Sequence, residues 1–213
     1  RWPMDESLLR FDKKQKYLVF DTETEGLNLI RSRPWQVAWL VVEGDRILEK
    51  HDMFLDWPNL DVSAGAAKIT GFTTKEYNKR KENPRKVWEK FSKHLYDENT
   101  FIVGQNLLGF DVYMVNIWRE LMKLEADYSY VERIIDTRAL AVAIAKDIPV
   151  DKDDFISWQY RLINHRERKL KTSQAFLLKK YNIDHDPKRL HDALYDIEMN
   201  FKVFRKQLFD LEI

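Results

Sequence analysis

The sequence predicts an α/β fold in which helices flank a mixed β-sheet. Three observations support this prediction. Short apolar runs fill the first third of the chain, further apolar runs then alternate with stretches of helical periodicity, and the chain ends in a long amphipathic stretch. Strands first, followed by strands alternating with helices, are typical of layered α/β proteins. The 213 residues suit one domain with a sizeable core.

Strands dominate the expected N-terminal third. Residues 17–20 (YLVF) form a continuous apolar run, which favours a strand buried on both faces. Residues 35–42 and 46–54 predict a hairpin, in which Gly44 supplies the unusual backbone angle of the turn. Two further strands are expected at 101–104 and 134–137.

Helical periodicity marks the segments between and after these strands. Pro84 suits a first helical turn, and apolar residues from Val87 to Leu95 follow it at helical spacing. In the last 20 residues, apolar side chains recur at steps of three and four, which predicts an amphipathic helix packed on the core. Further helices are expected at 112–124, 138–146 and 155–162.

Composition narrows the class of protein. The chain contains no cysteine, which excludes disulfides, thiolate metal sites and a cysteine nucleophile. No apolar run approaches the roughly 18 residues that span a bilayer, so we expect a cytoplasmic protein without membrane contact. The net charge is +1, which disfavours general nucleic-acid packaging and requires any nucleic-acid contact to be local, at a basic rim around an acidic pocket.

The first acidic pair follows the strand at 17–20. Asp21 and Glu23 stand two residues apart, so on a strand their side chains point to the same face. Such carboxylates repel each other unless a cation lies between them, and a divalent metal is the usual cation. An acid pair on the surface is the alternative, because the same spacing recurs at 196–198 and 210–212. Only the pair at Asp21 follows a buried apolar run.

Two further segments place acids where elements meet. Asp111 follows the expected strand at 101–104 and a turn containing Asn106, and it either caps the next helix or joins a site at the strand ends. His191 stands at the start of the last helix and Asp196 at the edge of its apolar stripe. This pair either faces a cleft or is a solvated helix end. Asp136 is expected to cap the helix at 138.

In this order, the segments 20–24, 106–111 and 191–196 resemble the three motifs of the DEDDh exonucleases. This family includes the proofreading subunit of bacterial replicative DNA polymerase, RNase T and oligoribonuclease. Weaker matches at 35–38, 69–73, 136–137 and 178–183 occur in family order, and the resemblance covers roughly residues 16 to 208. Two departures affect the region expected to hold the 3′ nucleotide: Thr70 replaces a frequent histidine and Glu25 a frequent small hydroxyl residue.

The resemblance implies a ribonuclease H-like fold with a mixed five-stranded sheet, in a single exonuclease domain spanning 1–213. Relative to the family, residues 1–15 are an N-terminal extension and residues around 147–170 an insertion. The insertion ends in a basic run, which either contacts phosphates or, as we favour, is a solvated face: Arg166, Arg168, Lys169 and Lys171.

The implied activity is release of nucleoside monophosphates from the 3′ end of single-stranded DNA, in proofreading or repair. Two Mg²⁺ or Mn²⁺ ions are expected on Asp21, Glu23, Asp111 and Asp196, with His191 as the base. A DNA polymerase is a possible partner. Alternatives are an exoribonuclease and an inactive nucleic-acid-binding module. The expected substrate-binding residues are Thr24, Gly26, Leu27, Phe72 and Asn106, with a core role as the alternative for Phe72.

Overall fold

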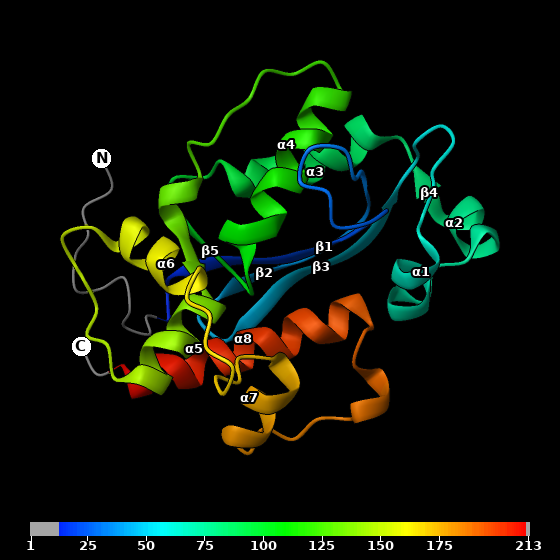
Figure 1. The fold of residues 1–213 in the computed structure, drawn as a ribbon. Coiled ribbons are helices and arrows are strands. Elements are labelled where there is room, and N and C mark those ends of the chain that lie inside the picture. Colours follow the sequence, from blue (N-terminus) through cyan, green and yellow to red (C-terminus); the bar gives the residue numbers. More distant parts are fainter. Residues whose placement is uncertain (1–12, 212–213) are drawn as a thin grey trace.

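A six-stranded mixed sheet forms the centre of the molecule in the computed structural model, which describes residues 13–211 (Figure 1). The strand order is β4-β3-β2-β1-β5-β6. β2 is antiparallel to its two neighbours β1 and β3, whereas β5 and β6 run parallel to β1. The strands are β1 (Lys16–Thr24), β2 (Pro34–Glu43), β3 (Arg46–Leu55), β4 (Lys81–Glu82), β5 (Thr100–Gly104) and β6 (Ile134–Asp136).

The predicted α/β fold with a mixed sheet is confirmed, with six strands instead of five. The additional strand, β4, is a two-residue edge strand that pairs with Phe54 and Leu55 of β3. A strand of two residues is too short to show an alternating pattern in the sequence, so only the three-dimensional structure reveals it. Residues 1–12 of the expected N-terminal extension lie outside the described residues.

Helices cover both faces of the sheet. The last helix, α8 (Ala193–Asp210), lies across one face with α5 (Thr137–Lys146) beside it, and α3 (Pro84–Leu95) and α4 (Val112–Leu121) cover the other (Figure 1). The other helices are α1 (Ala64–Thr70), α2 (Thr74–Arg80), α6 (Phe155–Ile163) and α7 (Gln174–Lys180). Within residues 13–211, no helix has the length and apolar character required to cross a bilayer.

Ring contacts show which face each residue of β1 occupies. The Tyr17 ring lies 5.5 Å from that of Phe204 on α8, whereas the Phe20 ring lies 5.1 Å from that of Phe91 on α3. Because side chains alternate along a strand, the odd-numbered residues of β1 face α8. Asp21 and Glu23 therefore point toward the face on which α8 packs.

The segment 147–170 packs on the main core. Its helix α6 buries Phe155, Trp158 and Leu162, and the indole Nε1 of Trp158 donates to the carbonyl of Pro149 at 3.0 Å. The basic run that follows α6 leads back to the sheet end at which β1, β5 and β6 finish. The interpretation of 147–170 as an insertion stays a prediction.

Candidate active site

The acid pair of β1 faces Asp196 of α8 across one pocket. Asp21, Glu23, His191 and Asp196 all line this pocket, which has a volume of about 400 Å³. Burial, followed by the charge of Asp196, raises the pKa of Asp21 to about 7. Burial and the charge of Asp21 raise the pKa of Glu23 to about 8. The fold therefore holds three mutually repelling carboxylates together, which destabilises their charged forms.

Asp111 lies behind the acid pair in a buried position and is held by Thr22. Its Oδ1 accepts hydrogen bonds from the Thr22 amide at 3.0 Å and from the Thr22 hydroxyl at 2.6 Å. Burial and the charge of Asp21 raise the pKa of Asp111 well above its ordinary value. The side chain makes no capping bond to α4, so the capping alternative is wrong. The chain enters α4 through a π-helical turn, Leu107–Asp111, which directs this carboxylate toward β1.

The main-chain amide of His191 is hydrogen-bonded to the side chain of Asp196. The His191 amide donates to both carboxylate oxygens of Asp196, at 3.1 and 3.0 Å. His191 has a φ of 81°, a left-handed conformation that non-glycine residues seldom adopt. Burial raises the pKa of Asp196, while the His191 contacts oppose that rise. The main chain of His191 is thus fixed by Asp196, and its side chain is exposed at the pocket.

Three polar residues at this site were not singled out from the sequence. Thr22 holds Asp111, Gln105 lines the pocket, and Gln174 also lines it while its Nε2 donates to the main-chain carbonyl of Asp196 at 2.9 Å. A threonine within a buried apolar strand was a signal for the first. Gln105 and Gln174 stand in loop and helix-start segments without any distinguishing pattern, so only the structure identifies them.

The donor chemistry of the site fits a hard divalent cation. Among residues 13–211, no group of three or more His, Cys, Asp or Glu side chains is already arranged to hold a metal ion. However, the four carboxylates supply only oxygen, and their raised pKa values show that the pocket disfavours uncompensated negative charge. A bound cation relieves that repulsion, and oxygen donors suit Mg²⁺ or Mn²⁺.

The loop after β1 exposes an apolar surface next to the acid pair. The Thr24 hydroxyl donates to the Gly26 carbonyl, which turns the buried Thr24 side chain inward. Leu27 is 86% exposed and Ile30 is 80% exposed. Of the three residues expected here to bind substrate, Leu27 therefore offers a side chain to solvent, whereas Thr24 shapes the turn. Gly26 contributes its carbonyl to that turn.

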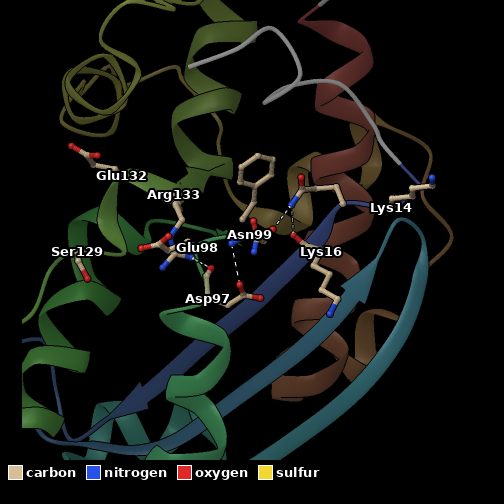
Figure 2. A pocket seen from close by; sticks show the side chains of 10 residues that line it. Lys14, Lys16, Asp97, Glu98, Asn99, Ser129, Glu132 and Arg133 are labelled. Carbon is tan, nitrogen blue, oxygen red and sulfur yellow. Dashed lines mark hydrogen bonds between the residues drawn. The ribbon is translucent and has the colours of Figure 1, made fainter. Parts of the chain in front are cut away.

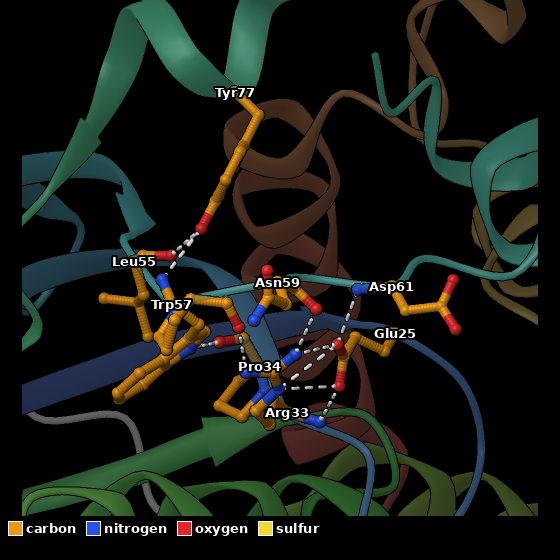
Figure 3. A network of polar contacts seen from close by, with 9 residues as sticks. Glu25, Arg33, Pro34, Leu55, Trp57, Asn59, Asp61 and Tyr77 are labelled. Atoms are coloured by element: carbon orange, nitrogen blue, oxygen red, sulfur yellow. Dashed lines mark hydrogen bonds and ion pairs between the residues drawn. The ribbon is translucent and has the colours of Figure 1, made fainter. Parts of the chain in front are cut away.

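A partly buried ion pair between Glu25 and Arg33 fixes this loop to the chain after β3 (Figure 3). The Arg33 Nη2 atom donates to Glu25 Oε1 at 2.7 Å, and the same guanidinium donates to the carbonyls of Pro58 and Asn59. The Glu25 carboxylate also accepts from the amides of Arg33 and Asp61. These contacts lower the pKa of Glu25 despite its partial burial. Glu25, the departure from the family pattern, is thus a structural anchor of the loop.

Phe72 and Asn106 lie beside the acid pocket rather than in it. Phe72 packs edge-to-face on Trp35, with ring centroids 4.9 Å apart, and is partly exposed in a small pocket that His191 also lines. Asn106 lines another neighbouring pocket, and its amide donates to Asp136 Oδ1 at 2.8 Å. Asp136 also accepts from the Arg138 amide and so caps α5.

A larger hollow, of about 770 Å³, lies at the opposite end of the sheet, where β1 and β5 begin (Figure 2). Its polar groups serve the fold. Arg133 donates to the main-chain carbonyls of Asp97 and Thr100, both at 2.7 Å, and Asp97 accepts from the Thr100 hydroxyl. These contacts join the end of α3 to the starts of β5 and β6, and the acids expected to act in catalysis lie at the other end of the strands.

Comparison with known proteins identifies relatives of this chain. The family model described as RNase T exonuclease matches residues 18–204. The DNA polymerase III of PolC type from Pediococcus pentosaceus is 28% identical over 104 residues, which cover 49% of this chain and 7% of that protein.

Solved structures of exonuclease I share the fold. One apo structure has a TM-score of 0.71 at 19% identity, with 92% of this chain and 44% of that chain covered. The Escherichia coli enzyme in complex with a dA16 oligonucleotide has a TM-score of 0.70 at 20% identity, with 92% and 42% covered. This chain thus spans less than half of the relatives it matches. Because the family model covers most of its length, the chain belongs to the RNase T family of DEDDh 3′–5′ exonucleases.

Proposed function

We propose that this chain removes nucleoside monophosphates from the 3′ end of single-stranded DNA, using two divalent metal ions. The observation that best supports this is the convergence of Asp21, Glu23 and Asp196 on one pocket with His191 at its rim. Holding these carboxylates together costs stability, since burial disfavours their charged forms and their charges repel each other. Its arrangement favours an enzyme over a binding module or scaffold.

The proposed mechanism assigns a role to each residue. Asp21, Glu23, Asp111 and Asp196 would hold the cations, which when bound stabilise charge on the leaving oxygen and activate water. His191 would accept the proton of the attacking water at its ring, because an imidazole is a side chain suited to act as a base near neutral pH. Thr22 holds Asp111 in place, and the backbone bond to Asp196 holds His191 at the pocket.

DNA as substrate is supported by the relatives. The exonuclease I structures include complexes with DNA oligonucleotides, and the PolC-type relative is a DNA polymerase. We extend both facts to this chain as a proposal, which includes proofreading or repair as the role and a DNA polymerase as a possible partner. The apolar loop surface at Leu27 and Ile30 offers a contact for a terminal base.

The test is digestion of 3′-labelled single-stranded DNA and RNA by the wild type and by Asp21→Ala. The wild type should release mononucleotides from DNA with Mg²⁺ or Mn²⁺ and none with EDTA, and Asp21→Ala should lose this release while staying folded by circular dichroism. Glu89→Ala, which removes an exposed acid of α3, is the matched control and should keep the activity. Degradation of RNA alone contradicts the DNA preference, and full activity of Asp21→Ala contradicts the assigned site.

A further inference from the structure

A basic pocket adjoins the candidate active site. It has a volume of about 690 Å³ and is lined by Arg138 of α5, by Arg166 and Arg168 of the segment after α6, and by Asn106 and Thr172. The pocket thus brings part of the basic run of 147–170 together with an arginine from a different element. The sequence alone assigns no function to that basic run.

The two pockets share a wall. Gln105 lines the acid pocket and its neighbour Asn106 lines the basic one, while Thr172 lines the basic pocket and its neighbour Ser173 lines the acid one. The Gln105 Nε2 donates to the Thr172 carbonyl at 3.0 Å and so bridges the two segments. The acid pocket and the basic pocket therefore adjoin each other at this hydrogen bond.

The arginine side chains of the basic pocket are available to bind a ligand. Glu167, the acid in its lining, already pairs with Lys146 at 2.5 Å and with His165 at 3.2 Å. Arg166 and Arg168 form no ion pair with any residue of 13–211 and are exposed. The lining therefore presents positive charge that no acid of the described chain neutralises.

Arg138 gives the pocket a feature that surface arginines lack. Its Nε atom is buried and has no hydrogen-bond partner within residues 13–211. A buried donor without an acceptor is energetically costly, so this position favours an anionic oxygen that satisfies it. A guanidinium can bind the oxygens of a phosphate through two parallel hydrogen bonds, so a phosphate group fits this position.

We propose that this pocket binds backbone phosphates of the nucleic-acid strand upstream of its 3′ terminal nucleotide. The inference rests on the proposed function. The acid pocket would shorten the strand at its 3′ end, and the rest of the strand would run past Gln105 and Thr172 into the basic pocket. Phosphate contacts position a strand without reading its sequence, and arginines in a groove track the backbone of single strands. The segment 147–170 would then serve to place Arg166 and Arg168 along that path.

The test compares binding of 12-nucleotide single-stranded DNA and RNA by fluorescence anisotropy in EDTA, where hydrolysis is suppressed. Arg166→Ala/Arg168→Ala should raise Kd at least tenfold at low salt and reduce the slope of log K against log salt by about 1.4, at about 0.7 per phosphate contact. Arg138→Gln should also weaken binding. Lys86→Ala/Lys90→Ala removes the same charge from exposed positions of α3 and should match the wild type.

Length dependence provides a second readout. The wild type should bind the 12-mer more tightly than a dinucleotide, and the double arginine variant should lose most of that gain. If its affinity and salt slope equal those of the α3 control, the phosphate path is refuted. If the wild type binds the 12-mer but releases no nucleotide with Mg²⁺ or Mn²⁺, the proposed function fails separately. Circular dichroism verifies folding, and the exposed Arg166 and Arg168 keep the test valid if Arg138→Gln misfolds.

Discussion

Replacing Asp21 by asparagine in the metal-free protein tests how far the burial of this carboxylate, together with its repulsion by Asp196, destabilises the folded state. Asparagine has the same shape but no charge, so this substitution removes a carboxylate whose pKa rises from 3.8 to about 7 on folding. That rise corresponds to roughly 4 kcal/mol of free energy favouring the unfolded state once the group is ionised. Asp21→Asn should therefore stabilise the protein while abolishing the proposed activity.

The sign of the effect depends on pH. Well below pH 3.8 the carboxyl is protonated in both states, so wild type and variant should be equally stable. As pH rises through 3.8 the unfolded chain loses the proton first, and the wild type loses stability until its folded pKa of about 7 is passed. At pH 8 the variant should be more stable by up to roughly 4 kcal/mol, or by roughly 8 to 16 °C in Tm for a chain of this size.

Thermal and urea unfolding in EDTA between pH 4 and 8.5 measure this difference. Glu89→Gln on α3 is the control for an exposed acid and should show little change across the range. Addition of Mg²⁺ should raise the Tm of the wild type more than that of Asp21→Asn, because the cation replaces the repulsion with attraction. A variant that is less stable than the wild type at pH 8, or a difference that does not vary with pH, would refute the reasoning.

Three further substitutions test other contacts of the site. Thr22→Val removes the 2.6 Å hydroxyl bond to Asp111 and should lower the unfolding free energy at pH 8 by about 1–2 kcal/mol in urea titrations; an unchanged midpoint contradicts this. Arg33→Ala breaks the anchor at Glu25, so KM for oligonucleotides should rise several-fold more than kcat falls, and equal changes in both would argue against a positioning role. His191→Ala should reduce turnover by roughly 10²- to 10⁴-fold while metal affinity by calorimetry stays the same; lost affinity with a normal rate at saturating metal would make His191 a ligand.

The sequence alone determines the parts of this protein that depend on local periodicity. A period of two places Asp21 and Glu23 on one face of a strand, and the strand before them is apolar enough to be buried. Steps of three and four define the stripe of α8 and leave Asp196 at its edge. The order of the three motifs along the chain indicates the family, which the family model then shows.

Only the tertiary structure decides which distant segments meet. The bond from Thr22 to Asp111 spans 89 residues, and it replaces the helix cap that a local interpretation of Asp111 allows. Glu25 and Arg33 anchor a loop to carbonyls at 58–59, and Gln105 meets Thr172 between the acid and basic pockets. These contacts join residues through hydrogen bonds between separate elements. Whether these hydrogen bonds form depends on how the chain runs between the elements. The spacing of residue types within one segment carries no information about that path.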